Sequence, residues 1–219
     1  MLSKIFDFIS TTLVYLIYPP LCPLCKEITD ERGQICNSCL EKIFKLDTEK
    51  SFGEVFVITK YREGTRQLLR KLKFDNDLSV LPTIKKILDT EKCSAELEKF
   101  IAQADVATFV PLHQERLKER GYNQTELIFK DFFAEKNLPT ENLLIRHKST
   151  PRLYKFNPEE RKKIVQGAFS FAQNASVCDK KILLVDDIFT TGATLSECAK
   201  VLQENGAKKI FVLAFASDS

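Results

Sequence analysis

The chain has 219 residues, of which 44% are hydrophobic and 29% charged. This composition excludes a disordered chain, and the length is sufficient for one ordinary domain with a small appendage. The 33 basic residues exceed the 30 acidic ones by only +3, so charge alone does not indicate a nucleic-acid partner. Seven cysteines, four of them in two close pairs, favour a metal site in a reducing compartment over a secreted disulfide framework.

Residues 1–21 are mostly apolar, with hydrophobic side chains at helical spacing as far as Pro19 and Pro20. The segment is shorter than the roughly 20 apolar residues that a membrane span needs. It is not followed by a small-residue cleavage site of the kind that ends a signal peptide. We therefore expect a helix packed on the body of the protein, with contact to a membrane surface as the alternative.

Two C-x-x-C pairs follow, Cys22 with Cys25 and, ten residues further on, Cys36 with Cys39. Four thiolates in this spacing can take all four positions of a tetrahedral zinc ion, so the metal is expected to be structural. The alternative is two unrelated pairs of free thiols. We expect no chemistry from the remaining cysteines, Cys93, Cys178 and Cys198.

The segment that follows is expected to form a strand at 55–61 and a basic amphipathic helix at 62–74. In that helix the leucines point inward, while four basic residues lie largely on the solvent side: Arg66, Arg70, Lys71 and Lys73. This basic face is either simply solvated or an anion-binding surface. Further helices are expected at 78–88 and 91–104.

A strand at 104–110 is expected to lead through a loop to a helix at 123–136. The loop carries Arg116, Lys118 and Arg120, and arginine suits phosphate because its planar fork matches pairs of phosphate oxygens. His113 in this loop is either a general base or a residue bonded to the backbone. His147, after a strand at 143–146, is equally open.

Residues 146–163 contain seven basic side chains against two acids, with Tyr154 and Phe156 among them. Pro151 and Pro158 exclude a long helix, so the segment is expected to be a mobile loop. Such a loop can stack on bases and contact phosphates, can close over a ligand, or can be merely solvated. A short strand at 167–171 follows.

The most informative stretch is residues 181–195. An apolar run, 182–185, is expected to be a buried strand that ends in Asp186 and Asp187. The turn Thr190-Thr191-Gly192-Ala193-Thr194 follows, and then a helix. Backbone N–H groups and the positive end of a helix would then converge on a phosphate. The two carboxylates can accept hydrogen bonds from a diol or hold a divalent cation, so the pattern describes a ribose 5-phosphate site.

The same stretch resembles the loop of type I phosphoribosyltransferases that binds 5-phosphoribosyl-1-pyrophosphate (PRPP). Two other interpretations are a structural strand–helix turn and the acidic strand of an ATPase. The ATPase needs a G-x-x-x-x-G-K-[ST] motif that the sequence lacks. With a last strand at 209–215, the alternation of strands and helices predicts the α/β class, as a parallel sheet flanked by helices.

Two more features narrow the resemblance to the ComF family of phosphoribosyltransferase-like proteins. One is the run Val110-Pro111-Leu112-His113, then Arg116, then Arg120-Gly121-Tyr122-Asn123-Gln124. The other is the four-cysteine module in front of it. The chain departs from the family pattern at Leu153 and Ile164, where we expect glutamine and asparagine, so the family's lid contacts are not carried over.

The resemblance implies a zinc module at 1–50, with an apolar helix, and a type I phosphoribosyltransferase fold at 51–219. Asp186 and Asp187 would be catalytic and would bind the ribose hydroxyls of PRPP, residues 190–194 its 5-phosphate, and Arg116 and Arg120 its pyrophosphate, with Mg²⁺. Transfer from PRPP passes through a cationic ribose, which the acids would stabilise.

The family is associated with natural transformation, acting on incoming single-stranded DNA with other DNA-uptake proteins at the cytoplasmic face of the inner membrane. The resemblance therefore implies a cytoplasmic protein, with peripheral attachment to that membrane as a further expectation. The alternatives are a phosphoribosyltransferase of nucleotide metabolism whose acceptor the sequence does not name, and a non-catalytic protein that senses PRPP or binds single-stranded DNA. The sequence does not specify an oligomeric state.

Overall fold

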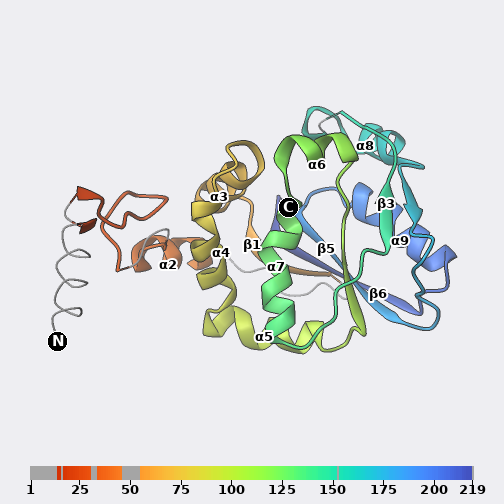
Figure 1. Cartoon of the computed structure of the whole chain (residues 1–219), viewed down its shortest axis with the longest axis horizontal. Coiled ribbons are helices and arrows are strands. Elements are labelled where there is room, and N and C mark those ends of the chain that lie inside the picture. The colour runs from red at the N-terminus through yellow and green to blue at the C-terminus, as the bar shows by residue number, and fades with distance from the viewer. Residues whose placement is uncertain (1–13, 16, 31–33, 46–54, 152, 219) are drawn as a thin grey trace.

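A parallel four-stranded sheet forms the centre of the computed structural model, which describes every residue except 1–13, 16, 31–33, 46–54, 152 and 219 (Figure 1). The strand order is β1-β6-β5-β2. The strands are β1 (Val55–Lys60), β2 (Val106–Phe109), β5 (Lys181–Phe189) and β6 (Lys209–Ser217). Both faces of the sheet are buried, which explains the nearly continuous apolar runs of these strands. The predicted parallel α/β sheet is confirmed.

Two shorter strands lie outside that sheet. β3 (Leu144–Arg146) and β4 (Phe169–Phe171) pair with each other in an antiparallel ribbon. The sequence predicted both strands, and the structure places them in a separate antiparallel pair outside the parallel sheet. Each of the two strands has only three residues. They pair with each other because the basic segment between them reverses the direction of the chain.

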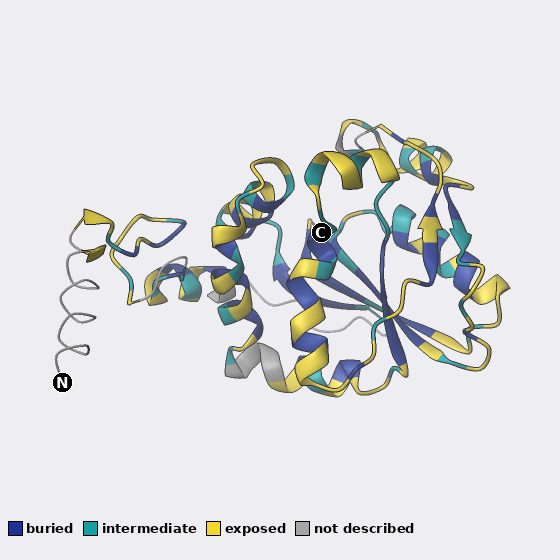
Figure 2. Ribbon diagram, viewed as in Figure 1, coloured by how far each residue is buried: buried dark blue, intermediate teal, exposed yellow. Residues whose placement is uncertain are grey.

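Each face of the sheet has its own apolar core, and β5 contributes alternate residues to the two. Leu183 and Val185 belong to the larger core, whereas Ile182 and Leu184 belong to the smaller one. The larger core is covered by α3 (Glu63–Phe74), α4 (Leu81–Leu88), α5 (Glu91–Ile101) and α7 (Gln124–Glu135). The smaller is covered by α9 (Ala193–Glu204) and the β3–β4 ribbon, and the buried strands separate the two layers (Figure 2).

Two predictions for the segments before and after β2 need correction. The helix expected at 78–88 begins with a 3-10 turn, Leu78–Val80, because the Asp77 carboxylate caps Ser79 and Pro82 opens α4. The expected loop with three basic residues is mostly a helix, α6 (Gln114–Arg120), which His113 caps and Gly121 ends in the left-handed region.

The basic segment is also more ordered than expected. It contains a 3-10 turn, Leu153–Lys155, and α8 (Pro158–Val165). Asn157 and Glu160 form a capping box at the start of α8, and Pro158 lies in its first turn, where proline favours a helix start. The prediction of a mobile loop across all of 146–163 is therefore wrong for its second half.

The N-terminal module lies to one side of the sheet, next to α3 and α4 (Figure 1). It contains a bridge between Leu21 and Ile28 and α2 (Asn37–Lys45). Gly64 in α3 permits close packing, since a Cβ there would lie 2.7 Å from Leu24 Cδ1. The boundary predicted near residue 50 falls in 46–54, outside the described residues, and it stays a prediction.

Most of the apolar segment 1–21 also lies outside the described residues. Its described part includes four exposed side chains, Val14, Tyr15, Ile17 and Tyr18. The expectation that this segment packs on the body is wrong for these four residues. Within the part of the chain that the structure describes, every helix is too short or too polar to cross a membrane.

Candidate functional site

The four cysteines of the N-terminal module converge on one point. Their Sγ atoms all lie within 4.8 Å of one another, and Cys22 and Cys39 are buried. Burial opposes ionisation of Cys22, but hydrogen bonds from the backbone amides of Cys25, Cys36 and Leu24 outweigh it and lower its pKa to about 7. Four thiols at this spacing, with no fifth ligand position left for a substrate, fit a structural zinc ion, as the sequence predicted.

The acidic pair lies at the carboxyl edge of the sheet, but not at the end of its own strand. The sequence predicted a strand that ends in Asp186 and Asp187, yet β5 pairs with β6 through Phe189, with Asp186 opposite Ala214. The other neighbour, β2, ends where Phe109 faces Val185. Asp186 and Asp187 therefore project past the end of β2 while remaining in register with β6. This is the edge at which open α/β sheets bind ligands.

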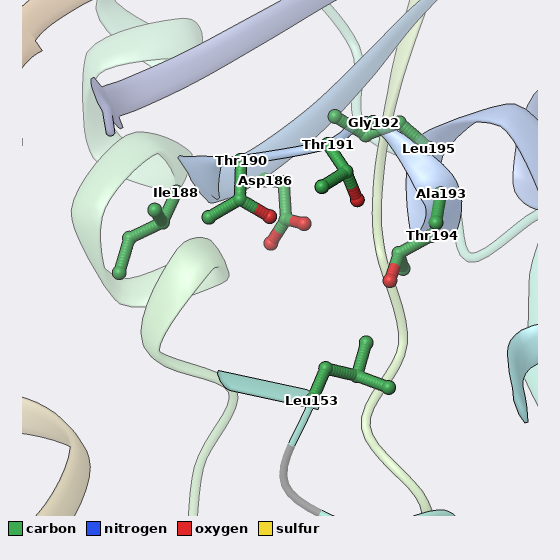
Figure 3. Close-up of a pocket in the computed structure, with 9 residues that line it drawn as sticks. All are labelled: Leu153, Asp186, Ile188, Thr190, Thr191, Gly192, Ala193, Thr194 and Leu195. Atoms are coloured by element: carbon green, nitrogen blue, oxygen red, sulfur yellow. The ribbon is translucent and has the colours of Figure 1, made fainter. Parts of the chain in front are cut away.

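Asp186 opens into a pocket formed by the turn that follows β5. The pocket is lined by Leu153, Asp186, Ile188, Thr190, Thr191, Gly192, Ala193, Thr194 and Leu195. The threonines and Asp186 surround a common space, with Leu153 of the basic segment on its opposite side (Figure 3). Gly192 has a φ of 71° and caps α9, so the turn depends on a backbone conformation that glycine adopts without strain. All the residues predicted to bind the ribose 5-phosphate line this pocket, except Asp187.

Asp187 lies among other partners. It is 4% exposed, and Lys73 Nζ and Gln124 Nε2 are each 2.7 Å from its Oδ2. Gln124 Oε1 in turn accepts a hydrogen bond from Arg120 Nη1. A series of hydrogen-bonded side chains therefore connects Arg120, which was predicted to hold the pyrophosphate, to the acidic pair.

The pKa of Asp186 is shifted by its surroundings. Burial is the main cause that raises the pKa of Asp186, to about 7, and the neighbouring charge of Asp187 adds to it. The ammonium of Lys73 acts in the opposite direction. For Arg120, which is half-buried, burial lowers the pKa, and the Asp187 charge opposes that effect.

Arg116 was also predicted to hold pyrophosphate. Arg116 and a second arginine, Arg146, both donate hydrogen bonds to Thr150. Arg116 Nη2 donates to the Thr150 carbonyl oxygen at 2.5 Å, and Arg146 Nη2 donates to Thr150 Oγ1 at 2.5 Å. Arg146 is 7% exposed and lies 5.3 Å from the ring centroid of Phe169. Among the described residues, neither arginine has a carboxylate in salt-bridge contact, and Arg146 Nε is unpartnered. The two guanidinium groups thus place positive charge around Thr150.

Three residues of this region were missed or misassigned from the sequence. Lys73 was expected on the solvent side of its helix, and Arg146 was counted only as part of a basic loop. Gln124 was noted only as part of a motif. Arg146 could have been found, since strand alternation places it on the buried side with Leu144. Lys73 and Gln124 could not, because their partner is remote in sequence.

Both histidines bond to the backbone. His113 Nδ1 accepts from the Glu115 N–H at 3.4 Å and caps α6. His147 Nε2 lies 3.0 Å from the Gly167 carbonyl oxygen. These contacts favour the structural alternative over a general base. Among the other cysteines, Cys198 is buried and Cys178 exposed, and the Cys93 side chain lies outside the described residues.

Comparisons with known proteins find similarity along most of the chain. A family model, the double zinc ribbon domain, matches residues 13–51. Competence protein F of Haemophilus influenzae is 28% identical over 199 residues, which cover 90% of this chain and 84% of that protein. DNA utilization protein YhgH of Escherichia coli K12 is 25% identical over 193 residues, 88% of this chain and 82% of that protein.

Among solved structures, the chain is similar to a glutamine PRPP amidotransferase from Bacillus subtilis, with 25% identity and a TM-score of 0.36. The match covers 54% of this chain and 25% of the larger enzyme.

Proposed function

From its homology along most of its length to competence protein F and to DNA utilization protein YhgH, we propose that the chain is a ComF-type protein. It would bind PRPP with Mg²⁺ and handle incoming single-stranded DNA during natural transformation, together with DNA-uptake proteins at the cytoplasmic face of the inner membrane. The observation that carries the PRPP proposal is one pocket that joins Asp186 to the turn 190–194 and the start of α9. A carboxylate and a phosphate-binding turn at this spacing suit a phosphorylated diol.

Each part of the site has a role under this proposal. The amides and hydroxyls of residues 190–194 hold the 5-phosphate, and Asp186 accepts hydrogen bonds from the ribose hydroxyls. Arg116 and Arg120 lie on the α6 side and meet the pyrophosphate. Asp187 supports the same ribose from within its hydrogen-bonded network. Mg²⁺ prefers oxygen ligands and commonly binds through substrate phosphates, so it would arrive with PRPP and offset its charge.

Calorimetry with PRPP and Mg²⁺ tests the ligand. The protein should bind, and Asp186→Ala combined with Asp187→Ala should abolish binding. Ribose 5-phosphate alone should bind more weakly, since it lacks the pyrophosphate. A protein that shows no heat with PRPP at any Mg²⁺ concentration does not have the proposed site.

The DNA part of the proposal rests on exposed basic residues of α3 and α8. Arg66 and Arg70 are exposed on α3, and Lys162 and Lys163 are exposed on α8. An electrophoretic shift with single-stranded DNA should show binding that weakens steeply as salt rises, because phosphate contacts release counterions. Charge reversal at Lys162 and Lys163 together should reduce both the affinity and its salt slope. Salt-independent binding, or none, would remove DNA from the proposal.

A phosphoribosyltransferase of nucleotide metabolism is the second candidate. The observation that favours it is Leu153, which belongs to the basic segment and yet lines the pocket opposite Thr194. A segment that covers a site can exclude water during transfer. Pyrophosphate release from PRPP, measured against a panel of acceptors, separates this candidate from a protein that binds PRPP without turnover or senses it.

A further inference from the structure

Lys73 contacts the acidic pair from outside the strand–turn–helix motif. It lies near the end of α3, and its side chain is 18% exposed against 5% for Asp187. The separation of 2.7 Å between Lys73 Nζ and Asp187 Oδ2 makes a direct, largely desolvated ion pair. Gln124 Nε2 donates to the same oxygen. The carboxylate is therefore bound from two helices that cover the same face of the sheet.

This ion pair affects the electrostatic repulsion that a phosphorylated ligand would meet at the acidic pair. Two adjacent carboxylates at one edge repel any phosphorylated ligand, and burial strengthens that repulsion because the local dielectric is low. A buried carboxylate left without a partner is also costly in itself. An ammonium on Asp187 removes one of the two negative charges without blocking Asp186, which is the acid that lines the pocket.

We propose that Lys73 is a positioning residue of the ligand site, whose ammonium compensates the charge of Asp187 so that an anionic sugar phosphate can bind beside the acidic pair. The inference rests on the proposed function above. Lys73 acts through Asp187 and is not a contact for the ligand. Its effect on affinity should therefore depend on the charge at residue 187.

The neighbouring Lys71 provides a matched comparison on the same helix. Its Nζ lies 3.0 Å from Asp77 Oδ2, and the two side chains are 22% and 30% exposed. That pair links α3 to the turn directly after it, and neither residue lines the pocket. A general effect of removing a lysine from α3 should appear in both variants, whereas an effect on the site should appear only at Lys73.

The test is Mg²⁺–PRPP calorimetry on the full chain and its variants at one salt concentration. Lys73→Met should weaken binding about tenfold or more, because it leaves Asp187 buried and uncompensated. Lys71→Met should stay within about twofold, as expected for a pair at a more exposed position. Lys73→Arg keeps the charge and should retain most of the affinity. Lys73→Met combined with Asp187→Asn should bind more tightly than Lys73→Met alone.

The outcomes separate the inference from the function on which it rests. If the unaltered protein does not bind PRPP, the proposed function fails and the inference fails with it. If the unaltered protein binds but Lys73→Met binds equally well, only the inference is overturned. It is also overturned if the double variant is no better than Lys73→Met, since Lys73 would then contact the ligand or simply hold the fold.

Thermal melting without ligand provides a separate measurement of the pair. Lys73→Met should lower the melting temperature, and adding Asp187→Asn should recover part of the loss, because the uncompensated charge is gone. Additive losses from the two substitutions would show that Lys73 does not compensate Asp187 and would overturn the inference.

Discussion

Asp186 and Asp187 are adjacent in the chain, yet their carboxylates meet different surroundings. Asp186 lines the pocket with the threonine turn, whereas Asp187 is held by Lys73 and Gln124 on the side of α3 and α7. The difference follows from strand geometry, since consecutive residues of β5 face opposite sides of the sheet. The two aspartates, which the sequence motif does not distinguish, therefore have different surroundings in the structure.

Asp186→Asn should stabilise the ligand-free protein at pH 8 and leave it nearly unchanged at pH 4. The pKa of Asp186 is raised to about 7 by burial and by Asp187, above the value near 3.9 of an unfolded aspartate. Its protonated form thus favours folding below about pH 4, and that contribution is lost as pH rises through 7. We expect a gain on the order of 1–3 kcal/mol at pH 8 from urea unfolding. Equal stability of variant and parent at both pH values would contradict the prediction.

Gly192→Ala should weaken PRPP binding about tenfold, because a shifted turn misplaces the groups that hold the 5-phosphate. Gly192 has a φ of 71°, so alanine is strained there by about 1–2 kcal/mol. Gly167→Ala is the control, since Gly167 has a φ of 61° but does not line the pocket. Both variants should lose similar stability, and only Gly192→Ala should lose affinity. Equal losses of affinity would show that backbone strain acts on the whole domain.

Arg146→Lys should destabilise the protein by about 1–3 kcal/mol, because it removes the hydrogen bond to Thr150 Oγ1 and the stacking on Phe169 while a charge stays buried. Thr150→Val removes the other partner, and the double variant should lose less than the sum of the two. Lys148→Met, at an exposed neighbouring position, should change stability by less than about 0.5 kcal/mol. Chemical denaturation measures all four. Full additivity would contradict a working Arg146–Thr150 contact.

The purified protein should contain about one zinc per chain by metal analysis, as expected for one four-thiolate site. Cys22→Ser combined with Cys25→Ser should remove the metal and lower the melting temperature, since zinc binding is coupled to folding of such modules. Cys178→Ser is the control, because that thiol is exposed and lies outside the cluster. Zinc that persists in the double variant would place the metal elsewhere.

Local signals in the sequence were sufficient for much of the fold. The apolar runs predicted the six strands that the described residues form, and spacing alone predicted the four-cysteine cluster, because two C-x-x-C pairs need only a short hairpin to converge. The threonine turn and α9 were also correct, since glycine and helical periodicity act over a few residues. The sequence did not predict that α6 and α8 are helices, because short helices in basic segments depend on their caps more than on an apolar face.

The sequence by itself thus determined the parallel α/β sheet, the zinc module and the position of the acidic turn, since each is encoded in residues that are near one another in the chain. Only the tertiary structure decided that Asp187 is paired with Lys73, that Gln124 connects it to Arg120, and that Arg146 is buried beside Thr150. These contacts join helices and strands remote in sequence. Which side of a helix or strand meets which neighbour is fixed by packing over the whole sheet, and no local pattern records it.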